Sequence, residues 1–311
     1  MSVRISAIIC TFNRSKYLQK AIQSLIDQTL EKYEYEILVV DNCSVDDTRK
    51  VVDDKSRIAG NLHYIYESEI GLSKARNTGW EAAKGEYIAY LDDDAIATPH
   101  WLATLLHNFE NITPKPACIG GKIDPIWEAE RPEWLPDKLL PYLTILDWSS
   151  ELIIIDENQY IAGANMAFTQ QALTLANGFQ TKFGRRGKKL LSNEELVLQN
   201  QIRKHGLDIY YNPEAVVEHH VVADRLQQNW FVKRTYWQGV SRAFLIVSEQ
   251  SPSVLQQWKM GVYSLLNLLK SPKRIVKSLL PSRNPRYLQA RCSTASNIGY
   301  IVGLLTAKGG E

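Results

Sequence analysis

The sequence has little cysteine, and its cysteines form no pattern typical of a cross-linked or metal-bound scaffold. Only four of the 311 residues are cysteines, and neither a CxxC pair nor the histidine spacing of a zinc finger accompanies them. A disulfide framework and a structural zinc site are therefore not indicated, and we expect a cytoplasmic protein. The four are Cys10, Cys43, Cys118 and Cys292.

Long hydrophobic runs are also absent. A membrane-spanning helix needs roughly 18 or more apolar residues, and the best stretches, residues 260–269 and 298–305, are much shorter. The apolar start of the chain carries one early positive charge and no cleavage site of the Ala-x-Ala type. We interpret this start as a first buried strand, and we expect a protein that can sit on a membrane without crossing it.

The glycine-rich loops of two large nucleotide-binding classes are missing. No GxGxxG follows the first expected strand, and no GxxxxGK[ST] occurs anywhere in the chain. Readings as a dinucleotide-dependent oxidoreductase or a P-loop NTPase therefore lose their main support. If phosphates bind here, we expect a metal and side chains to hold them.

The charges present are distributed unevenly, although the net charge is only +2. Residues 231–311 contain 12 basic and 2 acidic residues, whereas the first 230 residues contain 24 basic and 32 acidic ones. Such a division indicates two roles within one chain. We expect an acidic part that holds cations and a basic part that meets something anionic.

Apolar patterns of strand and helix alternate along the first part of the chain. Strands separated by helices indicate an α/β fold with a mostly parallel sheet flanked by helices. Beyond residue 230 the pattern is helical, so we expect a catalytic domain over residues 1–230 and a basic helical extension over 231–311. Strands are expected at residues 4–11, 36–40, 62–66, 87–91, 119–126, 153–155, 166–168, 209–211 and 216–222, and helices after Ser15 and at residues 47–55, 72–84, 100–109 and 194–204.

Three carboxylates, Asp92, Asp93 and Asp94, follow directly on the buried strand at residues 87–91. Ligands of open parallel sheets bind beyond the carboxyl ends of the strands, and carboxylates so close to a core are costly unless a positive group is near. Mg²⁺ and Mn²⁺ choose oxygen ligands and bridge carboxylates to phosphates. We favour a metal–diphosphate site, and the alternative is an acidic cap for the helix near Pro99.

Two further features lie at the same expected edge of the sheet. Asp41 ends the second strand and offers an acceptor for a base or ribose, although a helix-capping turn would look similar. Lys74 and Arg76 lie on the helix that begins after Gly71. A guanidinium there would lie along the phosphates, or else face solvent on an exposed helix surface.

Taken in order, these segments resemble family-2 glycosyltransferases. The resemblance covers about residues 3–225 and implies a GT-A fold that transfers a sugar from a nucleotide diphosphate with inversion at the anomeric carbon. Its motifs are IICTFNR at residues 8–14, VVDNCS at 39–44, GLSKARNTG at 71–79, AKGEYIAYLDDD at 83–94, GANMAF at 163–168, NEEL at 193–196 and His219.

The resemblance also implies roles for individual residues. Asp92 and Asp94 match the acids of the DxD motif, with Asp94 as a ligand of a divalent Mn²⁺ or Mg²⁺, and Asp93 belongs to the same donor site. Thr11, Asn13 and Arg14 match the loop that lines the nucleotide, Asp41 the acceptor for the base, and Arg76 a position near the diphosphate. The loop beside the donor sugar and acceptor corresponds to Gly163, Ala164, Asn165 and Met166.

The acidic pair Glu194 and Glu195 occupies the position of the catalytic base. Displacement at an anomeric carbon requires the acceptor hydroxyl to lose a proton to a nearby carboxylate, and Glu195 falls where the family usually has Asp. The alternative is that both acids only complement the dipole of the helix they begin. Strand alternation sends His219 and His220 to opposite sides, and the resemblance indicates His219 as a further metal ligand.

Two other functions compete with sugar transfer. One is a nucleotidyltransferase that makes a nucleotide sugar, although the first loop lacks the glycine favoured in that class. The other is a non-catalytic, membrane-docked carbohydrate-binding protein. We expect as partners a nucleotide-diphosphate sugar, most simply a UDP-sugar, and a glycan or lipid-linked acceptor in polysaccharide or glycan biosynthesis. The basic tail is expected at an anionic membrane surface, on the inner face, and not on nucleic acid.

Overall fold

The computed structural model describes residues 2–185, 191–280 and 284–307, and the chain forms two compact units. Their segments alternate along the chain, so the units do not follow a single cut in the sequence. The division into a catalytic domain and an extension at residue 230 stays a prediction about function. The first unit comprises Met1–Ile126, Thr144–Gly187 and Glu194–His220, and the second comprises Trp127–Leu143, Lys188–Asn193 and Val221–Glu311.

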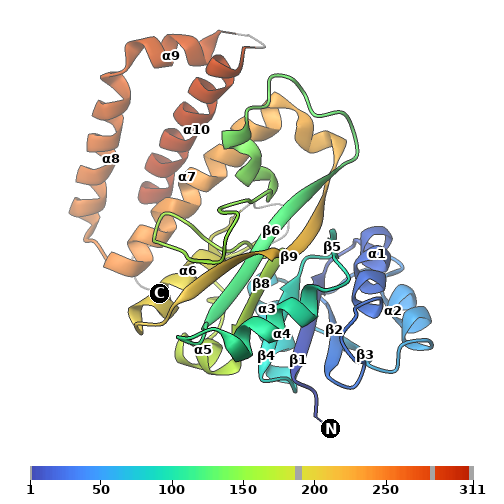
Figure 1. Cartoon of the computed structure of the whole chain (residues 1–311). Coiled ribbons are helices and arrows are strands. Elements are labelled where there is room, and N and C mark those ends of the chain that lie inside the picture. The colour runs from blue at the N-terminus through green and yellow to red at the C-terminus, as the bar shows by residue number, and fades with distance from the viewer. Residues whose placement is uncertain (1, 186–190, 281–283, 308–311) are drawn as a thin grey trace. The chain divides into compact units, whose positions relative to one another are not determined.

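A mixed sheet organises the first unit, with the strand order β3-β2-β1-β4-β8-β6-β9-β5, and β7 pairs with β9 (Figure 1). The first four strands in that order are parallel, as predicted, whereas β8 runs antiparallel to β4 and to β6. The strands are β1 (Ile5–Thr11), β2 (Tyr35–Asp41), β3 (Leu62–Tyr66), β4 (Tyr87–Leu91), β5 (Ala95–Ala97), β6 (Cys118–Trp127), β7 (Ile153–Ile154), β8 (Asn165–Thr169) and β9 (Ile209–Val221).

Helices cover both faces of the parallel strands, because β1 is apolar on both sides. Ile5 and Ile9 pack with α1, α2 and α4, whereas Ile8 packs in a second cluster with α3, α5 and α6. Alternate residues of a strand point to opposite faces, so the two clusters lie on opposite sides of the sheet. The helices are α1 (Ser15–Ile26), α2 (Thr48–Ser56), α3 (Leu72–Ala82), α4 (Trp101–Asn111), α5 (Gln170–Leu175) and α6 (Glu194–Lys204).

One local expectation was wrong. The two short strands expected around Pro213 are one continuous strand, β9. The backbone of β9 comes very close to β6 there, since a Cβ atom on Gly121 would lie 2.0 Å from the carbonyl oxygen of Ala215. The helix expected after Ser15 includes Ser15 as its first residue, and the backbone N–H of Ser15 donates to the carboxylate of Asp46.

The second unit is mainly helical, as the sequence predicted for its C-terminal part. Its long helices α7 and α10 pack closely through glycines. A Cβ atom on Gly239 would lie 2.0 Å from the backbone oxygen of Ser296, and one on Gly299 would lie 2.0 Å from that of Tyr236. The helical elements are η1 (Asp137–Leu143), η2 (Ala223–Leu226), α7 (Gln228–Gln250), α8 (Val254–Leu269), α9 (Pro272–Leu279) and α10 (Pro285–Thr306).

No helix within the described ranges combines the length and the apolar character needed to cross a bilayer. Helices α8, α9 and α10 appear in orange to red in Figure 1, with α9 beside one end of the other two. Both α8 and α9 contact α10.

Candidate active site

The three aspartates lie in a turn between β4 and β5, at the carboxyl end of the parallel strands. The backbone N–H of Ala95 closes this turn by donating to the carbonyl oxygen of Asp92. Asp93 and Asp94 are buried, whereas Asp92 is partly exposed. Helix α4 begins only at Trp101, so the alternative that the acids cap this helix is wrong. The position of the cluster instead agrees with the predicted ligand-binding edge.

Arg14 neutralises part of this charge. Its Nη1 atom lies 2.9 Å from Oδ1 of Asp93 and 2.5 Å from Oδ2 of Asp94, and the Thr11 hydroxyl donates to Asp93 over 2.9 Å. Burial raises the pKa of Asp93 to about 6, an effect that Arg14 opposes and Asp94 increases. The raised pKa indicates that Arg14 does not fully compensate the buried carboxylates, which makes a further cation favourable here.

Asp92, Asp94 and His219 form a cluster with the chemistry of a divalent-metal site. One possible ligand atom from each residue lies within 4.8 Å of those of the others, and Nε2 of His219 lies 3.3 Å from Oδ1 of Asp94. The antiparallel pairing of β5 with β9 places His219 opposite Ala95, next to the aspartate turn. Two carboxylates and an imidazole, two of them buried, fit a divalent ion such as Mn²⁺.

The neighbouring His220 is buried as well, although strand alternation places it on the opposite side of β9 from His219. Its ring packs edge-on against Tyr17, with 5.2 Å between the ring centroids. Both faces of β9 are therefore covered at this point. Of the two histidines, His219 is the one in the acidic cluster.

A buried ion pair joins α3 to the start of α6. Nη1 of Arg76 lies 3.0 Å from Oε1 of Glu194, and both side chains are almost fully buried. Nη2 of Arg76 also lies 3.5 Å from Oδ1 of Asp92. The alternative that Arg76 faces solvent on an exposed helix surface is therefore wrong. The guanidinium connects the acidic pair of α6 with the aspartate turn.

Gly163 makes room for this guanidinium. A Cβ atom at Gly163 would lie 2.2 Å from Nη2 of Arg76 and 3.3 Å from Oε1 of Glu195. The predicted donor-sugar loop therefore reaches both the arginine and the acidic pair. Residues separated widely in the sequence meet here because α3, α6 and the loop before β8 converge.

We predict that Gly163→Ala lowers the rate of the predicted sugar transfer by about 10-fold or more, because the methyl group forces Arg76 out of its position. Steady-state kinetics, with thermal unfolding as a check of folding, would measure the effect. Gly60→Ala is the matched control, since no atom lies within 4 Å of a Cβ atom there. Equal activity of both variants with the wild type would contradict the prediction.

The acid Glu194 carries an unusual pKa. Burial raises its pKa to about 8, Glu195 increases the shift, and Arg76 opposes it. The folded state therefore holds a proton on this group more strongly than the unfolded chain does. Its stabilising contribution is fully present below the ordinary pKa of 4.5 and is lost as the pH rises through about 8.

We predict that Glu194→Gln, which cannot ionise, makes the unfolding temperature less sensitive to pH between about 5 and about 9. Relative to the wild type, the variant should gain stability as the pH rises. Differential scanning calorimetry across this range would measure the difference. The exposed Glu31→Gln serves as control, and parallel pH profiles of wild type and Glu194→Gln would contradict the prediction.

The residues predicted for the nucleotide loop and the base lie at the ends of β1 and β2 and in the loop after β1. Asn13 adopts a positive φ of 55° and accepts from the backbone N–H of Val45. Asp41 is buried, accepting from the backbone N–H of Ser44 and from the Tyr64 hydroxyl, each over 2.8 Å. Recognition of a base by Asp41 stays a prediction. In this structure the Asp41 carboxylate accepts a hydrogen bond from the loop that follows β2.

The remaining loop residues have buried side chains. Asn165 donates from its Nδ2 to the carbonyl oxygens of Lys122 and Ala215, and its Oδ1 accepts from the indole of Trp101. Ala164 and Met166 are also buried. Their role beside the donor sugar stays a prediction, and the buried side chains leave the backbone of this loop as the part that could contact a ligand.

Sequence reasoning did not identify the contacts that the arginines make with acids. The predicted places of Arg14 at the nucleotide and of Arg76 near the diphosphate stay predictions, and in this structure the two side chains contact the carboxyl groups of Asp94 and Glu194. Tyr17, whose ring lies 5.8 Å from the Arg14 guanidinium, was not identified at all. The sequence does show that several buried acids need positive partners. It does not show which arginine supplies the positive charge.

Comparison with known proteins agrees with this geometry. The family model described as "Glycosyl transferase family 2" matches residues 6–170, more than half of the chain. A glucosyl-dolichyl phosphate glucuronosyltransferase of Haloferax volcanii is 27% identical over 308 residues, covering 98% of this chain and 97% of the relative.

Two solved structures share the fold at low sequence identity. A mannosyltransferase from Pyrobaculum calidifontis, in complex with GDP-Man and Mn²⁺, is 17% identical, with a TM-score of 0.59 over 99% of this chain and 75% of its own. TarS 1-349 of S. aureus in complex with UDP is 15% identical, with a TM-score of 0.57 over 98% of this chain and 91% of its own. The chain thus belongs to glycosyl transferase family 2 and is a glycosyltransferase with a GT-A fold.

Proposed function

We propose that the protein transfers a sugar from a nucleoside diphosphate sugar, with a UDP-sugar as the first candidate, to a hydroxyl acceptor with inversion at the anomeric carbon. The observation that carries this proposal is the cluster of Asp92, Asp94 and His219 at the carboxyl end of the parallel strands. A divalent cation held by these residues would act as a Lewis acid on the departing diphosphate.

The two arginines serve complementary roles in this proposal. Arg14 contacts Asp93 and Asp94, and so holds the carboxylates in place beside the proposed metal ligands. Arg76 lies between Glu194 and Asp92, where its second nitrogen faces the aspartate at 3.5 Å. Both guanidinium groups place fixed positive charge near the position proposed for the diphosphate, and such preorganised charge favours a developing anion.

Glu195 is the proposed general base. Adjacent residues of a helix point about 100° apart. Glu194 accepts a hydrogen bond from Arg76, and its raised pKa of about 8 favours the protonated form, which cannot act as a base. Glu195 is less buried, and its Oε1 approaches the Gly163 position in the predicted acceptor loop. In the proposed step it accepts the proton of the acceptor hydroxyl while the oxygen bonds to the anomeric carbon and the diphosphate leaves.

The acceptor is proposed to be a glycan or a lipid-linked sugar in glycan biosynthesis. Support comes from the Haloferax relative, whose name states a glucosyl-dolichyl phosphate acceptor and which aligns along almost the whole chain. Donor identity is open to a direct screen, because the related structures hold GDP-Man in one case and UDP in another.

Release of nucleoside diphosphate from a panel of UDP-sugars and GDP-mannose would test the proposal, with Mn²⁺, with Mg²⁺ and with EDTA. We expect release that depends on both metal and acceptor, and a product of inverted anomeric configuration by NMR. Because the ligand set includes an imidazole, we expect Mn²⁺ to support a higher rate than Mg²⁺.

The same assay separates the competing functions. A nucleotidyltransferase would release pyrophosphate from a nucleoside triphosphate and a sugar phosphate, and a binding protein would release nothing. Either result, or full turnover in EDTA with a retained anomeric configuration, would overturn the proposal.

A further inference from the structure

Helix α8 in the second unit presents its apolar side to solvent. Its buried side consists of Gln257, Gly261 and Leu268. The opposite side is a stripe of large apolar residues at helical spacing, of which every member is more than 40% exposed. This stripe, named the α8 stripe, consists of Leu255, Trp258, Val262, Leu266 and Leu269. Contiguous apolar surface of this kind marks an interaction site.

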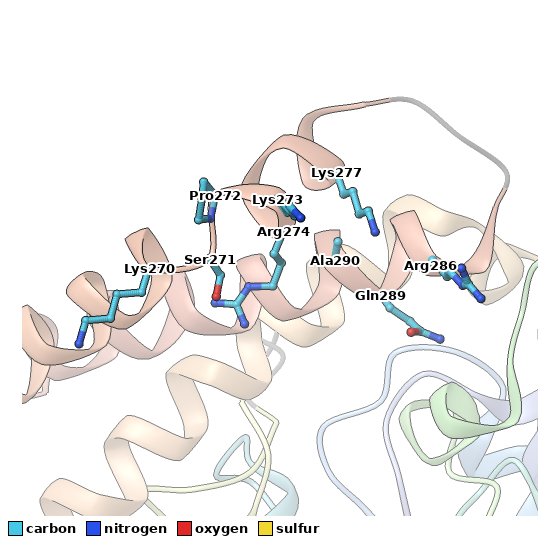
Figure 2. Close-up of a pocket in the computed structure, with 9 residues that line it drawn as sticks. All are labelled: Lys270, Ser271, Pro272, Lys273, Arg274, Lys277, Arg286, Gln289 and Ala290. Atoms are coloured by element: carbon cyan, nitrogen blue, oxygen red, sulfur yellow. The ribbon is translucent and has the colours of Figure 1, made fainter.

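A basic cluster lies next to the α8 stripe in the chain, at the junction of α8 with α9 and the start of α10. Its side chains surround one pocket, and all but Arg274 are exposed (Figure 2). The sequence contains no acidic residue between Glu249 and Glu311. The cluster consists of Lys270, Lys273, Arg274, Lys277 and Arg286.

Helix α9 continues the same combination of charge and exposed apolar groups. None of its residues is buried, and Val276 and Leu279 are 57% and 77% exposed beside the exposed Lys273 and Lys277. Trp258 on α8 adds an amphipathic ring of the kind enriched at membrane interfaces. Together, α8 and α9 have the composition of helices that lie in the interfacial plane of a bilayer.

We propose that the α8 stripe and the basic cluster form a docking surface for an anionic lipid bilayer. The apolar side chains enter the boundary between headgroups and acyl chains, and the lysines and arginines contact lipid phosphates. A second copy of this chain fits less well, because pairing this surface with itself would bring like charges together. A nucleic acid would satisfy the basic residues but leave the aliphatic stripe in water.

Flotation of the full-length protein with vesicles would test this proposal without donor or acceptor, so the result is independent of sugar transfer. Vesicles of phosphatidylcholine alone are compared with vesicles that also contain phosphatidylglycerol. We expect binding to the second kind only, weakened by salt. Lys273→Ser with Lys277→Ser should lower the partition coefficient about 30-fold at low salt.

The apolar contribution has its own variant. Trp258→Gln with Leu266→Gln should lower partitioning about 10-fold or more, and both sites are exposed, so folding should be retained. Each test variant has a matched control at exposed positions of the first unit. The lysine control is Lys20→Ser with Lys50→Ser, and the apolar control is Ile58→Gln with Leu175→Gln. These controls should bind vesicles like the wild type.

Several outcomes would overturn the proposal. One is no binding to anionic vesicles, and another is equal binding to both kinds of vesicle. A third is a test variant that binds no more weakly than its control. A fourth outcome would come from light scattering. If the protein formed dimers and the Trp258→Gln, Leu266→Gln variant did not, the α8 stripe would join two copies of the chain.

Discussion

Replacing Asp94 with alanine should lower the rate of sugar transfer by about 10³-fold or more. Asp94 is 4% exposed, contacts Arg14 and His219, and belongs to the proposed metal site. Its loss removes one of two carboxylate ligands and leaves His219 without its charged neighbour. Metal-assisted stabilisation of a leaving group contributes several kcal/mol, and about 4 kcal/mol corresponds to 10³-fold in rate.

Metal binding provides a second measurement on the same variant. Titration with Mn²⁺, followed by electron paramagnetic resonance, should show tight binding to the wild type and loss of that binding in Asp94→Ala. Asp53→Ala is a suitable control, because Asp53 is a partly exposed acid of α2 whose carboxylate contacts Arg49 of the same helix. Wild-type turnover in a folded Asp94→Ala protein would remove the basis for the proposed metal site.

Replacing Glu195 with glutamine should lower kcat by about 10²–10⁴-fold while leaving donor affinity nearly unchanged. The substitution keeps the shape of the side chain but removes its ability to accept a proton in the transfer step, and general-base catalysis contributes an effect of this size. Turnover would be measured with saturating donor and acceptor. Isothermal titration with the donor and Mn²⁺ would show whether binding persists.

Glu194→Gln is the informative partner of this variant. Glu194 is paired with Arg76, so its substitution should disturb the stability of the site and its pH dependence more than proton transfer. If Glu194→Gln removed turnover with donor affinity intact, and Glu195→Gln retained full turnover, the assignment of the base would have to be reversed. Full activity in both variants would exclude a carboxylate base from α6.

The parallel half of the sheet and the aspartate turn were predictable from the sequence. The apolar residues of β1, β2 and β4 lie in short continuous runs, and the helical periodicity of α1 is local, so neighbouring residues suffice to identify these elements. Because the sequence identifies β4, it also identifies where this strand ends. Asp92, Asp93 and Asp94 come directly after that end. The antiparallel pairings of β8 with β4 and of β9 with β5 were less accessible, because the paired strands lie far apart in the sequence.

The counter-charges of the site were not predictable in the same way. Arg14 contacts Asp93 across 79 positions of the chain, and Arg76 contacts Glu194 across 118. Many arginines and lysines in the sequence were equally able to neutralise these acids. Only packing selects among them, because a guanidinium reaches a buried carboxylate when its own helix or loop is fixed at the right place.

The sequence by itself determined the family, the alternation of strands and helices, the acidic turn and the basic C-terminal part, since all of these depend on residues close together in the chain. Only the tertiary structure shows that Arg14 contacts Asp93 and Asp94, that Gly163 leaves space for Arg76, and that the α8 stripe is exposed. The physical reason is that burial and charge compensation depend on distances in space. Those distances exist only once separate segments pack against one another.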